Sequence, residues 1–173
     1  MSELILRAAT HADVPALSQL GIDSFVEKFA FLYNAEDLAA FLTETHSPVT
    51  VAGELADPKR LYRLAERDGT LAGYCKLGLT CGFPEYARGS NVIELKQLYT
   101  APGITGGGIG TALMDWAMDE AAQRTADEMQ LSVWSGNEGA QRFYARYGFA
   151  KVADITFAVG KQLDEEFLFA KLL

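Results

Sequence analysis

The sequence of 173 residues contains little cysteine and little histidine, with two residues of each type. Cys75 and Cys81 form no Cys-x-x-Cys pair, so the sequence predicts neither a zinc site nor a disulfide framework. Free thiols in a reducing compartment are the expected state, and no bound metal ion is expected. His11 and His46 have no partner pattern and are interpreted as structural or surface residues.

Long apolar runs are also missing. No segment approaches the roughly 18 apolar residues of a membrane-spanning helix. The first residues contain one short apolar patch, Leu4 to Leu6, directly after Glu3, which is unlike a secretory leader. We therefore expect no membrane partner, no leader sequence and a cytoplasmic location.

Positive charge is scarce, because 15 basic residues stand against 23 acidic ones and the formal net charge is -8. This balance argues against a nucleic-acid partner, which a basic surface would attract. Acidity of this size often reflects solubility alone, but it also suits a cationic substrate. With 49% hydrophobic and 11% aromatic residues, the composition is that of one folded domain spanning residues 1–173.

Apolar periodicity predicts strands and helices in mixed order. Asn34 and Asn137 are placed as N-caps, and Asp68-Gly69 as the turn of a hairpin. The predicted strands cover 4–7, 61–66, 71–79, 91–100, 129–133, 150–159 and 167–172. The predicted helices follow residue 13, cover 34–44, lie between 48 and 57, run from the glycine cluster to about 127, and run from 137 to 148. This order favours an α/β or α+β sheet covered by helices.

The segment TAPGITGGGIGTAL lies between a predicted strand and a predicted helix. A glycine run there lets several backbone N–H groups point at an anion, for which pyrophosphate is the natural guest. A P-loop would need Lys after Gly108, where Ile109 stands. A Rossmann fingerprint would need glycine where Thr111 or Leu113 falls. A merely flexible turn is the weaker alternative, since one turn does not require five glycines within eight residues.

A second motif, LSVWSGNEGAQRFYARYGF, follows. Ala140, Phe143, Tyr144 and Tyr147 fall on one face of its helix. In their order and spacing, the two motifs resemble the coenzyme A loop and the later Asn and Tyr-containing segment of the GNAT superfamily of N-acetyltransferases. That loop reads Gln/Arg-x-x-Gly-x-Gly/Ala; here both glycines match, but Thr105 stands in the place of Gln or Arg.

The similarity extends over most of the chain. SFVEKF, AGYCKL, IELKQLY and FAVG resemble the PaiA-like bacterial polyamine acetyltransferases. The resemblance implies the GNAT fold, a mixed and mostly antiparallel sheet with helices at its flanks, in which two central strands near Leu98 and Trp134 splay apart. It also implies acetyl-CoA as cosubstrate and a spermidine or spermine acceptor. Members of this superfamily are often dimers, which leaves a homodimer open.

The resemblance also assigns residues to the cosubstrate. The loop residues would hold the pyrophosphate through backbone N–H groups, and the strand residues would pair with the pantetheine arm, which Asn137 and Phe143 would face. The implied set is Leu98, Tyr99, Thr100, Thr105, Gly106, Gly107, Gly108, Ile109, Gly110, Thr111, Asn137 and Phe143.

Acetyl transfer to an amine needs a base, because an alkyl ammonium has a pKa of about 10.4. Glu94 lies where family members carry a general-base Glu that acts through water, although it could equally pair with a neighbouring Lys or Arg. Tyr144 matches the tyrosine that protonates the departing thiolate, the alternative being a core tyrosine. Neither Cys75 nor Cys81 has an activating neighbour, so direct attack in a ternary complex is expected.

The acceptor would be held by carboxylates and aromatic walls. Glu27, Phe29 and Tyr33 are the predicted acceptor-binding residues. Other acceptors stay open, namely a protein N-terminus, a lysine side chain or an aminoglycoside. A non-catalytic acetyl-CoA sensor is a further alternative, which the change at Thr105 favours.

Overall fold

The protein is described by a computed structural model for residues 3–104 and 106–173, which contain a seven-stranded sheet. The strand order is β1-β2-β3-β4-β5-β7-β6, and every neighbouring pair is antiparallel except β4 and β5. The mixed, mostly antiparallel sheet is therefore confirmed. The strands are β1 (Leu4–Ala8), β2 (Arg60–Arg67), β3 (Thr70–Gly78), β4 (Val92–Thr100), β5 (Glu128–Trp134), β6 (Ala150–Val159) and β7 (Gln162–Leu172).

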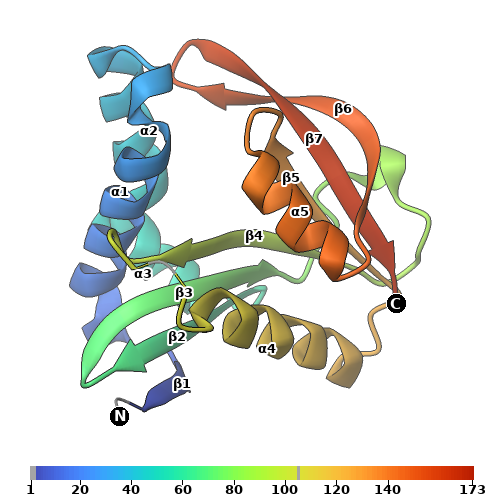
Figure 1. Cartoon of the computed structure of the whole chain (residues 1–173), viewed down its shortest axis with the longest axis horizontal. Coiled ribbons are helices and arrows are strands. Elements are labelled where there is room, and N and C mark those ends of the chain that lie inside the picture. The colour runs from blue at the N-terminus through green and yellow to red at the C-terminus, as the bar shows by residue number, and fades with distance from the viewer. Residues whose placement is uncertain (1–2, 105) are drawn as a thin grey trace.

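Helices cover both faces of this sheet (Figure 1). They are α1 (Val14–Phe29), α2 (Ala35–His46), α3 (Pro48–Ala56), α4 (Ile109–Gln123) and α5 (Glu138–Arg146), with short 3-10 turns η1 (His11–Asp13), η2 (Ala30–Leu32) and η3 (Pro84–Tyr86). The predicted caps are confirmed, because the Asn34 side chain accepts from the Asp37 N–H and the Asn137 side chain from the Ala140 N–H. None of the described helices has the length and apolar character needed to cross a bilayer.

Two predicted boundaries are wrong. Helix α4 ends at Gln123 rather than near residue 127, because Thr125 takes a left-handed φ of 54° that a helix cannot continue. Strand β7 begins at Gln162, five residues before the predicted start at 167. Its first half alternates poorly between apolar and polar residues, so its pairing with β5 and β6 leaves no local trace in the sequence.

The core lies in two layers, one on each face of the sheet. On one face, the fully buried side chains of Leu113, Met114, Ala117 and Ala121 form an apolar stripe that packs α4 against the strands. On the other face, α1 and α3 pack on Tyr74 and its buried neighbours. The strands between these layers are therefore held rigidly wherever they are paired.

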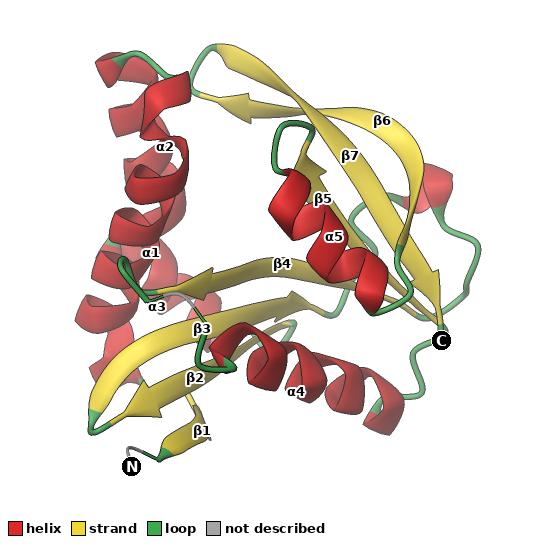
Figure 2. Ribbon diagram, viewed as in Figure 1, coloured by secondary structure: helices red, strands yellow, loops and turns green. Residues whose placement is uncertain are grey.

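Strands β4 and β5 separate after a short parallel stretch. They pair only at Val92↔Glu128, Ile93↔Met129 and Glu94↔Gln130, although both continue beyond it. Figure 2 shows the two strands diverging, with α5 beside the gap. Backbone groups along residues 95–100 therefore have no β5 partner, and backbone groups inside a protein need one. The splayed central strands are confirmed.

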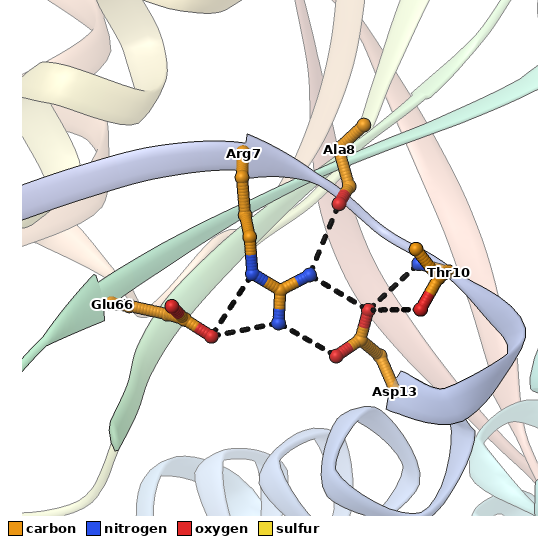
Figure 3. Close-up of polar contacts among 5 residues, drawn as sticks. All are labelled: Arg7, Ala8, Thr10, Asp13 and Glu66. Atoms are coloured by element: carbon orange, nitrogen blue, oxygen red, sulfur yellow. Dashed lines mark hydrogen bonds and ion pairs between the residues drawn. The ribbon is translucent and has the colours of Figure 1, made fainter. Parts of the chain in front are cut away.

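An ionic cluster fixes the beginning of the chain to the sheet (Figure 3). Arg7 on β1 donates to Glu66 on β2, with 3.0 Å between Nε and Oε1, and to Asp13, with 2.7 Å between Nη2 and Oδ1. The hydrogen bond from Arg7, with help from the Thr10 N–H, lowers the pKa of the Asp13 carboxyl to about 2. The start of α1 is thereby tied to β1 and β2, and the other end of this helix borders the site.

Candidate active site

Two adjoining cavities occupy the gap between β4 and β5. The larger has a volume of about 700 Å³ and the smaller about 460 Å³. Both are lined by Phe29 of α1, Leu98 of β4, Trp134 of β5 and Tyr144 of α5. The larger cavity extends toward α2 and the β6–β7 hairpin, and the smaller toward the start of α4. Together they form one cleft that passes between the splayed strands.

The glycine loop lies at the start of α4. Gly106, Gly107 and Gly108 have φ values of 75°, 72° and 76°, which other residues adopt only with strain. Gly108 is the N-cap of α4, so the loop directs backbone N–H groups and the helix dipole toward an anion. Ile109 is buried and anchors the first turn of α4 in the core, whereas Thr111 in the same turn is exposed. This geometry suits a pyrophosphate.

Gly110 lines the smaller cavity beside Phe143, and a methyl group added at Gly110 would lie 3.9 Å from that ring. The predicted loop residue Thr105 lies outside the described residues.

Arg67 contributes to this loop from β2 and was missed by sequence reasoning. Its Nη2 donates to the Gly107 carbonyl oxygen at 2.9 Å. This hydrogen bond fixes the orientation of the peptide group at Gly107, so the neighbouring backbone N–H groups are held in the orientation that an anion needs. No local sequence signal marks this contact, since 40 residues separate the two partners.

The free edge of β4 faces the cleft as the resemblance predicts. Leu98 lines both cavities, Thr100 lines the smaller one and Tyr99 lines the larger one. Tyr99 and Thr100 reach different cavities because the pleat turns successive side chains to opposite faces. The backbone of the same residues is left to pair with an extended ligand, as an additional strand would.

Tyr144 stands where the two cavities meet. Burial raises the pKa of its phenol above the ordinary value of 10, so the side chain carries its proton at neutral pH. Phe143 packs against it with 5.3 Å between ring centroids, and Phe149 packs at 6.1 Å. Asn137 lines both cavities while its side-chain oxygen caps α5. The helix therefore presents a protonated hydroxyl to the cleft.

Glu94 is buried at the point where β4 and β5 separate, and it lines the larger cavity. Its Oε2 lies 2.7 Å from Lys96 Nζ, so the alternative of an ion pair with a neighbouring lysine is confirmed. Its role as a base stays a prediction. A side chain added at Gly82 would meet this carboxylate, which would then have to shift.

The three predicted acceptor-binding residues are not brought together. Phe29 lines both cavities, and Tyr33 lines the larger one and donates its hydroxyl to Asp164. Glu27 lines neither; its Oε2 accepts from the Gly103 N–H at 3.1 Å. It lies at the glycine loop because the exposed face of α1 turns that way.

Glu166 on β7 was also missed. It lines the larger cavity, and its Oε2 is buried with no hydrogen-bond partner among the described residues. Burial, with a smaller contribution from the charge of Asp164, raises the pKa of this carboxyl from 4.5 to about 7. In the sequence it belongs to a run of three acidic residues, which ordinarily indicates a solvated surface.

Comparison with known proteins agrees with this geometry. The model of the acetyltransferase (GNAT) family matches residues 23–149. An uncharacterized N-acetyltransferase of Lactobacillus delbrueckii subsp. lactis is 28% identical over 161 residues, covering 93% of this chain and 92% of that protein. An uncharacterized N-acetyltransferase of Mycobacterium tuberculosis is 33% identical over 139 residues, covering 80% and 83%. The crystal structure of the PaiA N-acetyltransferase from Thermoplasma acidophilum in complex with coenzyme A superimposes with a TM-score of 0.81 at 22% identity, covering 99% of both chains.

Proposed function

The chain belongs to the GNAT acetyltransferase family and is an acetyl-CoA-dependent N-acetyltransferase, and from this premise we propose that its acceptor is a small primary amine, first of all a polyamine such as spermidine or spermine. The observation that carries the proposal is the chemistry of the larger cavity. It combines the carboxylates of Glu44 and Glu166 with the rings of Phe25, Tyr33 and Phe41. Carboxylates bind ammonium groups, and aromatic rings bind methylene chains and cations.

Two lysines on the β3–β4 side of this cavity are paired with carboxylates, whereas Lys28 and Arg60, which also line it, make no ion pair among the described residues. Lys76 Nζ lies 2.8 Å from Glu54 Oε2, and Lys96 is held by Glu94. Each of these positive charges is balanced by a carboxylate at contact distance. The resemblance to polyamine acetyltransferases points to the same class of acceptor.

The residues of the cleft fit acetyl-CoA, which supplies an acetyl group activated as a thioester. Backbone N–H groups of the glycine loop hold the pyrophosphate, since only glycines accept the loop's left-handed φ values. The free edge of β4 orients the extended arm. The acceptor enters from the larger cavity, so that its nitrogen meets the thioester in the gap between the strands.

Two side chains handle protons in this proposal. Glu94, through a water molecule, accepts a proton from the acceptor's nitrogen, which must expose its lone pair before it can attack. The hydroxyl of Tyr144 supplies a proton to the departing sulfur, a transfer that its neutral state at the working pH permits. The overall reaction releases one proton, because an ammonium is consumed and a neutral amide is formed.

The test is release of the coenzyme A thiol from acetyl-CoA with a panel of acceptors. Spermidine and spermine are compared with a lysine peptide, a peptide with a free N-terminus and an aminoglycoside. A value of kcat/KM at least tenfold higher for the polyamines supports the proposal. Preference for another amine rejects the polyamine and keeps the reaction. Binding of acetyl-CoA with no turnover across the panel favours the sensor.

A further inference from the structure

The buried oxygen of Glu166 has no partner among the residues that the structure describes, and it belongs to a group that lines the cleft. Among the described residues, four other buried side-chain atoms also lack a hydrogen-bond partner. These atoms belong to Ser24, His46, Arg63 and Arg67, which line neither cavity. A carboxylate oxygen that is removed from water without a donor is costly. Its position in a ligand cavity indicates that a ligand supplies the donor.

The sheet places Glu166 at the wide end of the gap. Glu166 lies opposite Trp134, the last residue of β5, in the register between β7 and β5. On the other side of β7 it lies opposite Ile155 of β6. Its negative charge contributes to raising the pKa of Tyr99 on β4, where burial is the larger cause. The carboxylate and the edge of β4 are therefore close enough to interact electrostatically.

Among the described residues, no neighbouring group donates a hydrogen bond to Glu166 Oε2. Asp164, on the same strand, accepts from the Tyr33 hydroxyl and from Gln162 Nε2 and offers no donor. Lys28 of α1 lines the same cavity, but its Nζ lies over the Tyr99 ring, 5.9 Å from the centroid, and makes no ion pair with Glu166 within the described segments. The missing partner is a donor that enters from outside.

We propose that Glu166 binds an ammonium group of the acceptor and thereby selects cationic amines. This inference rests on the proposed function, because it takes an amine to be the acceptor. An ammonium supplies both the donor and the opposite charge that the buried oxygen lacks, and such charge-assisted hydrogen bonds are the strong ones. The raised pKa of Glu166 agrees, since a cation is needed to favour the ionised form in this place.

The first experiment compares Glu166→Gln with the matched control Glu165→Gln, which changes the exposed neighbour on the same strand. For the amine that the wild type acetylates, Glu166→Gln is expected to raise KM by about 10- to 100-fold. The KM for acetyl-CoA and the value of kcat stay within about threefold of the wild type, as does every parameter of the control. An unchanged amine KM in Glu166→Gln overturns the inference.

The pH dependence adds a readout that a merely structural role would not change. Protonation of Glu166 removes the charge that Gln also lacks, so the difference in KM between wild type and Glu166→Gln shrinks as the pH falls from 8 to 6. Asp164, Tyr33 and Tyr99 are described titratable groups that interact electrostatically with Glu166, and Lys28 lines the same cavity; all four are retained in both proteins. A difference that stays constant over this range contradicts the assignment.

Two further measurements separate the role of Glu166 from the proposed function. Glu166→Asp keeps the charge on a shorter side chain and is expected to recover part of the affinity for the amine that Glu166→Gln loses. If the wild type acetylates no amine, the proposed function fails. Calorimetric titration of spermidine into the coenzyme A-loaded protein then decides about Glu166: weaker binding to Glu166→Gln supports the site, whereas equal binding or no binding to the wild type overturns it.

Discussion

His46 is expected to lower the stability of the folded protein in acid. The side chain is 2% exposed at the end of α2 and packs among Phe25, Phe41 and Tyr99. Its Nε2 has no hydrogen-bond partner among the described residues. Burial, followed by the positive charge of Lys76, lowers the pKa of the imidazole from 6.5 to about 4.

The sign follows from linkage between protonation and folding. The unfolded chain binds a proton at His46 below about pH 6.5, whereas the folded chain resists it down to about pH 4, so stability is lost as the pH falls through this window. The loss amounts to about 2 kcal/mol of the free energy of unfolding between pH 8 and pH 5. Glu166 acts in the opposite direction, because its pKa is raised in the folded state and its protonation at low pH relieves a buried charge.

A variant isolates the contribution of His46 from that of Glu166. The assay is urea unfolding of the wild type and of His46→Leu at pH 8 and pH 5. The stability of the variant relative to the wild type should rise by about 2 kcal/mol at the lower pH, whatever the substitution costs at pH 8. His11→Gln removes the other histidine, which is exposed, and should show no such change. A relative stability of His46→Leu that is the same at both pH values would refute the reasoning.

Three predictions concern the cleft. Tyr144→Phe should lower kcat roughly 100-fold in thiol-release assays, while the calorimetric Kd for acetyl-CoA stays unchanged. The control Tyr147→Phe, at the C-cap of the same helix, should retain kcat. An equal loss of kcat in both variants would show that Tyr144 has no role in proton transfer. Glu94→Gln should lower kcat at neutral pH and recover partly at higher pH, where more of the amine is already neutral; an unaltered rate would leave Glu94 as the partner of Lys96 only. Arg67→Ala should weaken acetyl-CoA binding about two- to tenfold by calorimetry, since one hydrogen bond to the loop is lost, and an unchanged Kd would contradict its positioning role.

Local features of the fold could be predicted from the sequence because their causes are local. The caps at Asn34 and Asn137 and the buried stripe of α4 each depend on residues within a few positions of one another. The glycine loop indicated an anion site for the same reason, since the chain must bend sharply before α4. The splay of β4 and β5 came from the family resemblance, as no pattern within either strand encodes where pairing stops.

The position of Glu166 in the cleft could not be predicted because it depends on pairing between distant segments. Glu166 is one of three consecutive acidic residues, which show no alternation of apolar and polar side chains. Only the register of β7 on β5 places Glu166 in the cavity. The position of Glu27 shows the same limit. The packing of α1 on the sheet, which no local pattern encodes, turns Glu27 to the glycine loop.

The two ends of the cleft differ in how they are built, and this difference separates binding of the cosubstrate from choice of the acceptor. The proposed acetyl-CoA end is formed by the chain from β4 through the loop into α4, together with Asn137, Phe143 and Tyr144 of the α5 segment. The proposed acceptor end lies beside the contact between α2 and the β6–β7 hairpin. In this contact Asp37 Oδ1 accepts from the Lys161 N–H at 2.9 Å, and the ring centroids of Phe41 and Phe157 are 5.8 Å apart. Because Glu166 belongs to that hairpin, we expect substitutions in the contact to displace its carboxylate and to leave the glycine loop in place. Substitutions there should therefore alter the amine KM while leaving acetyl-CoA affinity intact.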